Sequence, residues 1–453
     1  MNTNEIINKL GIKPNDMQTA ACKAITEGGH DVVILSPTGT GKTYAYLIPI
    51  ASMLDALSDE LQAVVILPGR ELALQSANVL KGMGTGLRTM ALYGGRPTMD
   101  EHRKLRQERP QIVFATPGRL NDHLDKGNIN ADDVKFLVID EFDKMLQMGF
   151  QNEMSQIISK LPSEEHRVLL SATDAEEIPS YLRDGFEPLR LDFLPKEQTE
   201  EKRVNIYKVE SPDKDKLETL ARLLVGLGNQ SSIVFLNYRD SVERTAQYLK
   251  ERGFTISMFH GGLDQVQRER SLYLFSNGTA NILVCTDLAS RGLDIPNIEN
   301  IIHYHIPEGE DAYIHRVGRT ARWDKHGRTF FILSPQETIP EYVSNPSESN
   351  ASVMITPYDI SGTAAPTDAI PQPKMATVYI GKGKKDKISK GDIVGFLCKK
   401  GGLKGTEIGR IDVFERYSYA AVPRQKLRQL LKLTRNEKIK GQKTITEEVA
   451  LDF

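Results

Sequence analysis

The sequence contains few cysteines and no long apolar run. Its three cysteines, Cys22, Cys285 and Cys398, are scattered along 453 residues, whereas disulfide frameworks and zinc clusters need cysteines in close sets. No apolar run approaches the roughly 18 residues that a membrane-spanning helix needs. Residues 1–14 also lack the basic start and apolar middle of a signal peptide. These absences predict a cytoplasmic protein that does not enter a membrane.

Acidic residues are scarce at the C-terminal end of the chain. Residues 374–453 hold 19 Lys and Arg against 9 Asp and Glu, although the whole chain has a net charge of -2. A basic segment on an acidic body favours a module that binds a polyanion. Charge alone leaves open a lysine-rich surface that only keeps the protein soluble.

Short apolar runs alternate with longer mixed segments in two stretches of the chain. The first stretch, residues 31–170, contains DVVILS, QAVVILP, QIVFATP, VKFLVID and HRVLLSAT. The second, residues 231–334, contains SSIVFLN, TISMFHG, NILVCTD, NIIHYHIP and RTFFILS. Such uniformly apolar runs are typical of parallel strands that are buried on both faces. The sequence therefore predicts two α/β domains, separated by the polar segment at residues 192–204.

A third domain is predicted after a segment rich in Ser, Pro, Ala and Thr, which has no hydrophobic period and is typical of a linker. The remaining residues suggest the order strand, helix, strand, strand, helix, which fits a small α+β nucleic-acid module. We expect domains at residues 1–197, 198–360 and 374–453, with a linker at residues 361–373.

A glycine-rich segment, SPTGTGKT at residues 36–43, follows the first apolar run. It matches the phosphate-loop spacing G-x-x-x-x-G-K-[ST], with Ser36 in place of the first glycine. Such a loop directs backbone N–H groups and a helix N-terminus toward phosphates. We expect Lys42 to reach the β- and γ-phosphates of ATP and Thr43 to hold Mg²⁺.

Three carboxylates follow a later apolar run, in VIDEFD at residues 138–143. Alone, this stretch is also typical of a helix N-terminus, where acidic side chains are favourable. The phosphate loop upstream favours a catalytic role for these carboxylates over that of a helix N-terminus. Asp140 is expected to hold Mg²⁺ through its water shell, and Glu141 to polarise the attacking water.

Together with further motifs, these residues resemble the DEAD-box RNA helicases, which are built from two RecA-like domains. The matching motifs of the first domain are GIKPNDMQ, SPTGTGKT, PGREL, the doublet Gly94-Gly95, TPGR, DEFD and SAT. Those of the second are IVFLN, HGGLDQVQR, TDLASRGLDIP and HRVGRTAR. The resemblance covers nearly all of residues 11–334. It implies an α/β fold of two tandem RecA-like parallel-sheet domains, and an enzyme that hydrolyses ATP to unwind short RNA duplexes.

The resemblance implies roles at the ATP site. Gln18 is expected to read adenine and Asp294 to bind the ribose hydroxyls, while Arg319 and Arg322 act as arginine fingers on the γ-phosphate. The implied nucleotide contacts are Gln18, Ser36, Pro37, Thr38, Gly39, Thr40, Gly41, Lys42, Thr43 and Asp294. Coupling of the ATP site to RNA is implied for Asp143, Ser171, Thr173 and His315.

Both domains are also implied to bind RNA, through its phosphates and sugars rather than its bases. The residues implied in these contacts are Arg70, Gly94, Gly95, Thr116, Arg119, Gln265, Arg268 and Thr286. Gly69 stands where the family commonly has threonine, which removes one hydroxyl from this surface.

The C-terminal segment reads TVYIGKGKKDKISKGDIVGFLCKKGGLKGTEIGRIDVFERYSYAAVP at residues 377–423, followed by KIKG at residues 438–441. It resembles the RNA-binding domain of the DbpA subfamily, an RRM variant that recognises a hairpin of large-subunit ribosomal RNA. It implies an α+β, RRM-like domain that tethers the helicase to the maturing large ribosomal subunit. A basic loop suited to phosphates carries Lys382, Lys384, Lys385 and Lys387. Three tyrosines are candidates for stacking on bases, although the last two also fit ordinary strand positions: Tyr379, Tyr417 and Tyr419.

Two other functions were weighed against an RNA helicase. An RNA clamp without hydrolysis is disfavoured because the residues expected to act in catalysis are all present: Lys42, Asp140, Glu141, Arg319 and Arg322. A DNA helicase of the same superfamily is disfavoured by GIKPNDMQ, HRVGRTAR and the C-terminal segment. Phe142 stands where the family has alanine and contributes no group to phosphoryl transfer. We therefore expect altered packing there, with hydrolysis retained. The oligomeric state is left open.

Overall fold

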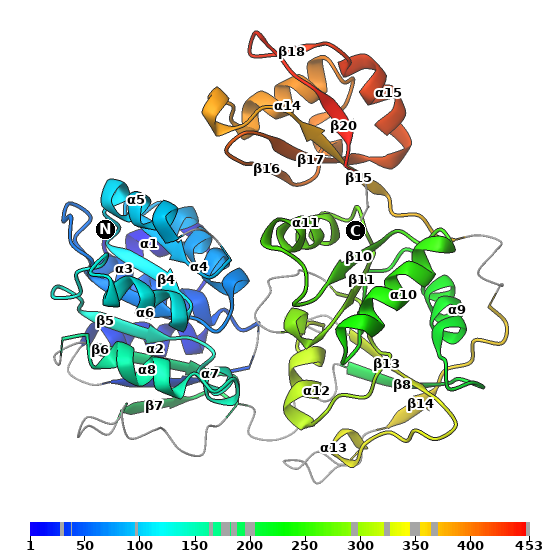
Figure 1. Ribbon diagram of the computed structural model, residues 1–453, viewed down its shortest axis with the longest axis horizontal. Coiled ribbons are helices and arrows are strands. Elements are labelled where there is room, and N and C mark those ends of the chain that lie inside the picture. Colours follow the sequence, from blue (N-terminus) through cyan, green and yellow to red (C-terminus); the bar gives the residue numbers. More distant parts are fainter. Residues whose placement is uncertain are drawn as a thin grey trace. The chain divides into compact units, whose positions relative to one another are not determined.

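The computed structural model describes residues 1–27, 31–37, 39–95, 98–162, 166–173, 182, 188–194, 204–290, 298–320, 327–344, 354–363 and 370–449. The chain divides into two compact units, built mainly from residues 1–198 and 199–453. The first unit holds one α/β domain, and the second holds another α/β domain and a small C-terminal domain (Figure 1). Among the described residues, no helix has the length and apolar character needed to cross a membrane.

Seven parallel strands form the sheet of the first domain, in the order β3-β4-β2-β5-β6-β1-β7. Their bounds are β1 (Val32–Leu35), β2 (Ala63–Ile66), β3 (Thr89–Leu92), β4 (Ile112–Ala115), β5 (Phe136–Ile139), β6 (His166–Ser171) and β7 (Leu189–Asp192). The central strands are buried along their whole length, because hydrophobic cores cover both faces of the sheet.

Eight helices of the described chain surround this sheet. One core packs against α1 (Thr3–Leu10), α2 (Asp16–Glu27), α3 (Lys42–Met53) and α4 (Arg70–Met83). The core on the other face packs against α5 (Thr98–Glu108), α6 (Pro117–Asp125), α7 (Phe142–Gln147) and α8 (Gln151–Ile158). The result is a three-layer α/β domain, as the alternation of apolar and mixed segments predicts.

The second domain repeats this plan with seven parallel strands in the order β10-β11-β9-β12-β13-β8-β14. The strands are β8 (Val204–Glu210), β9 (Ser232–Phe235), β10 (Ile256–Phe259), β11 (Ile282–Cys285), β12 (Asn300–His303), β13 (Gly327–Leu333) and β14 (Ile355–Pro357). The helices are α9 (Leu217–Leu227), α10 (Arg239–Glu251), α11 (Gln265–Ser276), α12 (Glu310–Val317) and α13 (Glu341–Ser344), with a 3-10 turn η3 (Asp287–Ser290).

The C-terminal domain is a four-stranded antiparallel sheet in the order β16-β17-β15-β20. Its strands are β15 (Met375–Ile380), β16 (Ile411–Val413), β17 (Ser418–Pro423) and β20 (Thr446–Glu448), with a separate hairpin of β18 (Lys438–Ile439) and β19 (Gln442–Lys443). The helices are α14 (Lys390–Lys399) and α15 (Arg424–Thr434), with short turns η4 (Lys384–Asp386) and η5 (Gly405–Glu407). The predicted order strand, helix, strand, strand, helix is present.

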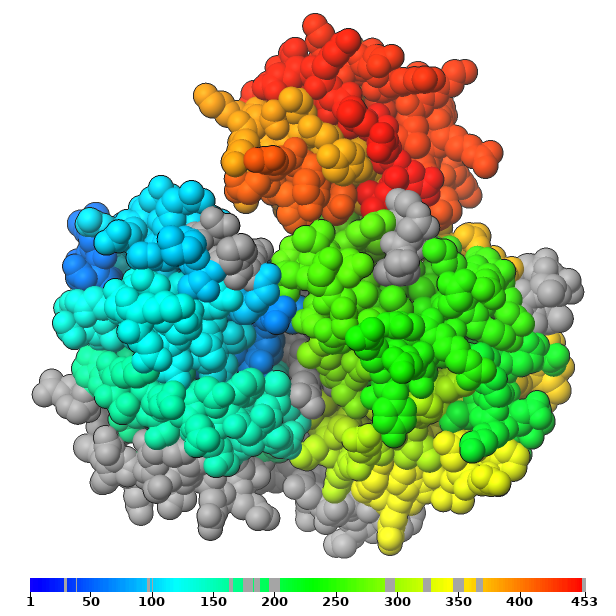
Figure 2. Space-filling model, in the orientation of Figure 1, coloured from blue at the N-terminus to red at the C-terminus, as the bar shows by residue number. Residues whose placement is uncertain are grey.

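Within the second unit, the C-terminal domain packs on α11 and the loop after it (Figures 1 and 2). The Thr377 hydroxyl lies 2.8 Å from the amide nitrogen of Asn277 and 2.7 Å from the hydroxyl of Thr279. The rings of Tyr273 and Tyr419 pack with centroids 5.1 Å apart. These contacts are buried, so the two domains share an interface rather than only a linker.

Each apolar run singled out in the sequence coincides with a strand, and the prediction of two RecA-like domains with a small α+β domain is confirmed. The sequence analysis missed β3, β7, β8, β14, β18, β19 and β20. Three of these strands show why the sequence did not reveal them. Strand β7 is largely exposed, β8 mixes buried and exposed positions, and β20 reads TEE. Strands near a sheet edge lack the continuous apolar run by which buried strands are recognised.

Replacing Gly383 by alanine should destabilise the C-terminal domain, because a Cβ there would overlap the carbonyl oxygen of Phe414 and the backbone nitrogen of Tyr417. We expect a loss of about 1–3 kcal/mol, measured as a lower melting temperature of this domain in the full chain. Gly395→Ala is the control, since its Cβ meets no atom within 4 Å and alanine favours α14. Equal melting temperatures of the two variants would contradict the prediction.

Candidate ATP site and RNA-binding residues

The phosphate loop connects β1 to the first turn of α3. Gly41 has a φ of +85°, a left-handed conformation that favours glycine, and α3 begins at the next residue, Lys42. The Lys42 ammonium donates to the carbonyl oxygens of Ser36 at 2.5 Å and Ser171 at 3.5 Å. The Ser36 and Thr40 hydroxyls lie 2.8 Å apart. This is the arrangement that the sequence predicts: a cationic side chain at the centre of a loop that opens a helix.

Gln18 is buried and bonded to the phosphate loop. Its amide nitrogen donates to the carbonyl oxygen of Gly41 at 3.2 Å, and its amide oxygen accepts from the Asn15 backbone at 3.1 Å. Asn15 in turn donates to the Thr40 carbonyl oxygen at 3.0 Å. The structure therefore gives Gln18 a role that the sequence did not predict, which is to hold the loop, and it adds Asn15 to the site.

The carboxylates of VIDEFD lie where β5 ends and α7 begins. Asp140 and Glu141 are both buried, and Glu141 has a φ of +52°, a conformation that costs a non-glycine residue about 1 kcal/mol or more. Burial raises the pKa of Asp140, while the Lys42 charge and the Glu141 backbone N–H act in the opposite direction. Strain and a buried carboxylate beside a cation are typical of a catalytic site.

Tyr46 is a second residue of this site that the sequence analysis missed. It lies on α3, is fully buried, and is close enough to Asp140 for the carboxylate charge to affect it. Burial first, and then the charge of Asp140, raise the pKa of Tyr46 well above its usual value. The phenol therefore stays protonated beside the carboxylate. Nothing in the sequence indicates that a tyrosine one turn after the phosphate loop lies beside Asp140.

Phe142 is buried, with 3% of its surface exposed. Its ring belongs to the core on the α5–α8 face of the sheet, which also contains Met145 and Leu169. The ring therefore points into the domain, and altered packing relative to alanine stays a prediction.

Asp143 and Thr173, expected to couple the ATP site to RNA, are in contact. The Thr173 hydroxyl donates to Asp143 at 2.9 Å, and the other carboxylate oxygen accepts from the Lys144 backbone at 3.0 Å. The Ser171 hydroxyl donates to the Thr173 carbonyl oxygen at 2.5 Å. The carboxylate of Asp143, in the first turn of α7, is thereby bonded to the segment after β6.

In the second unit, Arg316 is completely buried beside the expected coupling residue His315. Its guanidinium binds Asp287 at 2.5 and 2.8 Å, the Asn237 amide oxygen at 2.8 Å and the His305 carbonyl oxygen at 2.9 Å. The sequence analysis missed Arg316, because nothing in the local pattern pairs it with an aspartate 29 residues away. Arg319 is also buried, and Thr38, Asp294 and Arg322 lie outside the described residues.

The expected RNA-binding residues of the first domain lie at the ends of neighbouring strands. Gly94 and Gly95 follow β3, and a Cβ at Gly95 would come within 2.6 Å of the Arg70 guanidinium. Thr116 and Arg119 follow β4, where Thr116 is the N-cap of α6. Since β3 and β4 are adjacent parallel strands, these residues share one edge of the sheet.

In the second domain, Gln265 and Arg268 are buried in the first turns of α11. The Arg268 guanidinium donates to the carbonyl oxygens of Leu263 at 3.1 Å and Gly261 at 2.7 Å. Here it holds the loop before α11. Thr286, at the end of β11, is half-buried.

The basic loop of the C-terminal domain is largely exposed. Lys384, Lys385 and Lys387 are exposed, whereas Lys382 is half-buried and its ammonium lies 2.9 Å from Asp386. This loop therefore presents three ammonium groups to solvent.

The aromatic residues Tyr379, Phe414, Tyr417 and Tyr419 form one cluster on the sheet of the C-terminal domain. The rings of Phe414 and Tyr417 stack with centroids 4.8 Å apart, and those of Tyr379 and Tyr417 with centroids 5.6 Å apart. Tyr419 packs on Tyr273 of α11. At Tyr419, stacking on a base would therefore compete with the existing contact with Tyr273.

Comparison with known proteins decides the family. Residues 15–179 match the DEAD/DEAH box helicase family, residues 215–324 the helicase conserved C-terminal domain and residues 377–448 the DbpA RNA binding domain. The chain is 34% identical over 443 residues to the ATP-dependent RNA helicase DbpA of Escherichia coli strain K12, covering 96% of this chain and 94% of that protein. The chain belongs to the DEAD-box RNA helicases.

Other relatives agree with this assignment. The helicase is 36% identical to the ATP-dependent RNA helicase CshA of Limosilactobacillus reuteri, over 68% of this chain and 62% of that protein. The solved structure of Mss116p bound to ssRNA and AMP-PNP matches with a TM-score of 0.69 and 27% identity, over 79% of this chain and 77% of that one. S. cerevisiae Dbp5 has the same fold, with a TM-score of 0.71 over 79% of this chain and 93% of that one. The predicted enzyme class, an ATP-dependent RNA helicase, is confirmed.

Phe142→Ala should destabilise the first domain by about 3 kcal/mol, because it leaves a cavity in a packed core. Hydrolysis per folded molecule should change by less than roughly tenfold, which corresponds to about 1.4 kcal/mol in the barrier. The measurements are urea unfolding and steady-state phosphate release at a temperature where the variant is folded. Phe142→Leu, which keeps most of the volume, is the control. A rise in hydrolysis by orders of magnitude would instead identify the ring as a brake on the chemistry.

Proposed function

We propose that this helicase remodels large-subunit ribosomal RNA during ribosome assembly in the cytoplasm, and that its C-terminal domain tethers it to that RNA. The observation that carries the proposal is the C-terminal domain itself. It matches the DbpA RNA binding domain and exposes three lysines on one loop: Lys384, Lys385 and Lys387. Phosphates attract such a loop regardless of sequence, so recognition of one hairpin needs further contacts from the same domain.

For the chemistry, we propose that Lys42 binds the β- and γ-phosphates and that Glu141 orients the attacking water. The position of the Lys42 ammonium inside the phosphate loop and the burial of Glu141 support these roles. A water held by a fixed carboxylate is poised for in-line attack. Gln18 stays our candidate for adenine recognition, with Asp294 for the ribose and Arg319 and Arg322 as arginine fingers.

Mg²⁺ fits the residues of this site. The hydroxyl of Thr43 and the carboxylate of Asp140 are oxygen donors of the kind that Mg²⁺ prefers. Burial raises the pKa of Asp140, so a divalent cation would stabilise its charged form. When bound, the ion neutralises charge on the phosphate oxygens.

We further propose that Arg70, the doublet Gly94-Gly95, Thr116 and Arg119 bind RNA phosphates on the first domain. Their position at one edge of the sheet supports this set. On the second domain we propose Gln265, Arg268 and Thr286. Because Arg268 now holds the loop before α11, its contact with RNA requires that the guanidinium serve both the loop and a phosphate. The domain limits 1–197, 198–360 and 374–453 belong to the same proposal.

Glu141→Gln should abolish most ATP hydrolysis, by roughly 10²–10⁴-fold, because an amide cannot accept a proton from the attacking water. RNA binding should persist, since Glu141 is not among the proposed RNA contacts. The measurements are RNA-stimulated phosphate release and a filter-binding or fluorescence titration with RNA. Glu60→Gln, a substitution at an exposed position, is the control. Equal phosphate release by Glu141→Gln and the unsubstituted helicase would rule out this assignment.

Replacing both Lys384 and Lys385 by glutamine tests the tether while the domain interface stays intact. The double variant should need more large-subunit ribosomal RNA for half-maximal ATPase stimulation, with unchanged kcat. The slope of log affinity against log salt should fall by about 1.5, as expected for two lost phosphate contacts. Lys399→Gln with Lys432→Gln gives the same charge change at other exposed positions of this domain and should have little effect. An unchanged RNA concentration for half-maximal stimulation together with an unchanged slope would contradict the tether.

A further inference from the structure

Glu101, on α5, is a buried carboxylate that none of the roles described above uses. Its side chain is 4% exposed and accepts from the Arg119 guanidinium at 2.8 Å and the His123 ring at 3.1 Å. Arg119 is one of the proposed RNA contacts, in the first turn of α6, and His123 lies one turn further along the same helix. A residue of α5 thus holds two residues of α6.

The bonding pattern defines the charges in this cluster. The side-chain amide nitrogen of Asn128 lies 3.1 Å from Nδ1 of His123. The Nε2 atom of the same ring faces Glu101 at 3.1 Å. The charge of Glu101 is paired with that of Arg119 at 2.8 Å.

Stability does not explain such a pair well. Removing two charges from water costs about as much as their attraction returns, and apolar residues of similar volume are often equally stabilising. The Arg119 side chain is 11% exposed. It therefore reaches the surface of the domain while its guanidinium is paired with the buried Glu101. What the pair does provide is a fixed direction for a guanidinium. With five donors, a guanidinium can bind a carboxylate and a phosphate at once.

The cluster also contacts the end of β3 and the start of α5. The backbone N–H of Tyr93, the residue before the doublet Gly94-Gly95, points to Glu101 at 3.5 Å. Thr98, the first residue of α5, lies 3.3 Å from the Arg119 guanidinium. One carboxylate therefore joins the end of β3, α5 and the start of α6.

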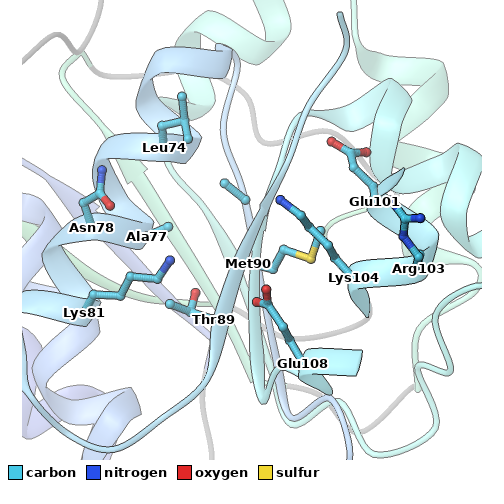
Figure 3. A pocket seen from close by; sticks show the side chains of 11 residues that line it. Leu74, Ala77, Asn78, Lys81, Thr89, Met90, Glu101, Arg103, Lys104 and Glu108 are labelled. Atoms are coloured by element: carbon cyan, nitrogen blue, oxygen red, sulfur yellow. The ribbon is translucent and has the colours of Figure 1, made fainter. Parts of the chain in front are cut away.

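A cavity lies beside α5, and Glu101 is one of the residues that line it. About 500 Å³ of space separates α5 from α4 over the edge strand β3 (Figure 3). Residues on its walls include Ala77 and Lys81 of α4, Thr89 and Met90 of β3, and Lys104 and Glu108 of α5. Among the side chains of α5 that the structure describes, Glu101 and Leu105 are the buried ones. Glu101 is therefore a main attachment of α5.

We propose that Glu101 is a positioning residue for RNA binding: its carboxylate holds the Arg119 guanidinium in the direction in which it meets a phosphate. This inference rests on the proposed function of Arg119 as an RNA contact. Glu101 itself does not touch RNA, since it is an anion below the surface.

Glu101→Gln tests the proposal in the full-length helicase. Glutamine removes the charge. Its one oxygen can take the place of Oε2 but accepts from Arg119 only as a neutral group, and its amide nitrogen then faces the backbone N–H of Tyr93. Arg119 is therefore held less firmly in its direction. We expect the RNA concentration for half-maximal ATPase stimulation to rise roughly tenfold, as for loss of one charge-assisted bond, with unchanged kcat at saturating RNA. The slope of log affinity for single-stranded RNA against log salt should fall by about 0.7. A purely structural role would not change that slope.

Glu108→Gln is the matched control, because it makes the same charge change at an exposed position of the same helix. It should leave both the RNA concentration and the slope unchanged. Melting temperatures of all variants show whether they are folded. If Glu101→Gln does not fold, Glu101→Asp, which keeps the charge but shortens the reach, takes its place in the same measurements.

A double-mutant cycle with Arg119→Ala separates the possible outcomes. If Glu101 acts through Arg119, adding Glu101→Gln to Arg119→Ala will not weaken RNA binding further. Additive losses of RNA affinity in the double variant would overturn the positioning role alone. So would a salt slope that is unchanged in Glu101→Gln but reduced in Arg119→Ala. If Arg119→Ala itself binds RNA as tightly as the unsubstituted helicase, the proposed RNA contact fails, and the inference with it.

Discussion

The functional residues of both helicase domains depend on one constraint, which is that parallel strands buried on both faces all end at the same edge of their sheet. In the first domain the segments after β1, β2, β3, β4, β5 and β6 carry the phosphate loop, Arg70, the glycine doublet, Thr116 with Arg119, the VIDEFD carboxylates and Ser171 with Thr173. Ligands of open α/β sheets bind at this carboxyl edge. A chain that buries these strands therefore gathers residues from six distant segments without any direct contact between most of them.

Burial also explains which parts of the structure the sequence predicts. Strands such as Phe136–Ile139 are covered by helices on both faces, so they must be apolar throughout, and the run can be read directly. Strand β7 lies at an edge and is largely exposed, so its sequence, LRLD, carries no such requirement. The phosphate loop and VIDEFD are readable for a different reason, because backbone geometry and chemistry together restrict the residues allowed there.

Residues that act through a distant partner cannot be recognised in this way. Glu101 pairs with Arg119 across 18 residues, and Arg316 pairs with Asp287 across 29. Neither pair has a local period or a spacing that would distinguish it from surface charge. Only the fold shows that these four side chains form two pairs, in which Glu101 and Arg316 are buried. Gln18 was named from the sequence, but its bonds to the phosphate loop could not be predicted. They depend on α2 packing against α3.

Helix α11 carries two of the proposed RNA contacts and also part of an interface within the chain. Its first turns contain Gln265 and Arg268, and its last turns contain Tyr273, on which Tyr419 of the C-terminal domain packs. Beyond the helix, the buried hydroxyls of Thr279 and Thr377 complete the interface. Hydrogen bonds between buried hydroxyls are costly to break unless water replaces them, so this interface resists separation. The aromatic face of the C-terminal sheet is therefore used in part for contact within the chain, and the exposed lysine loop is left as the surface of this domain best suited to RNA.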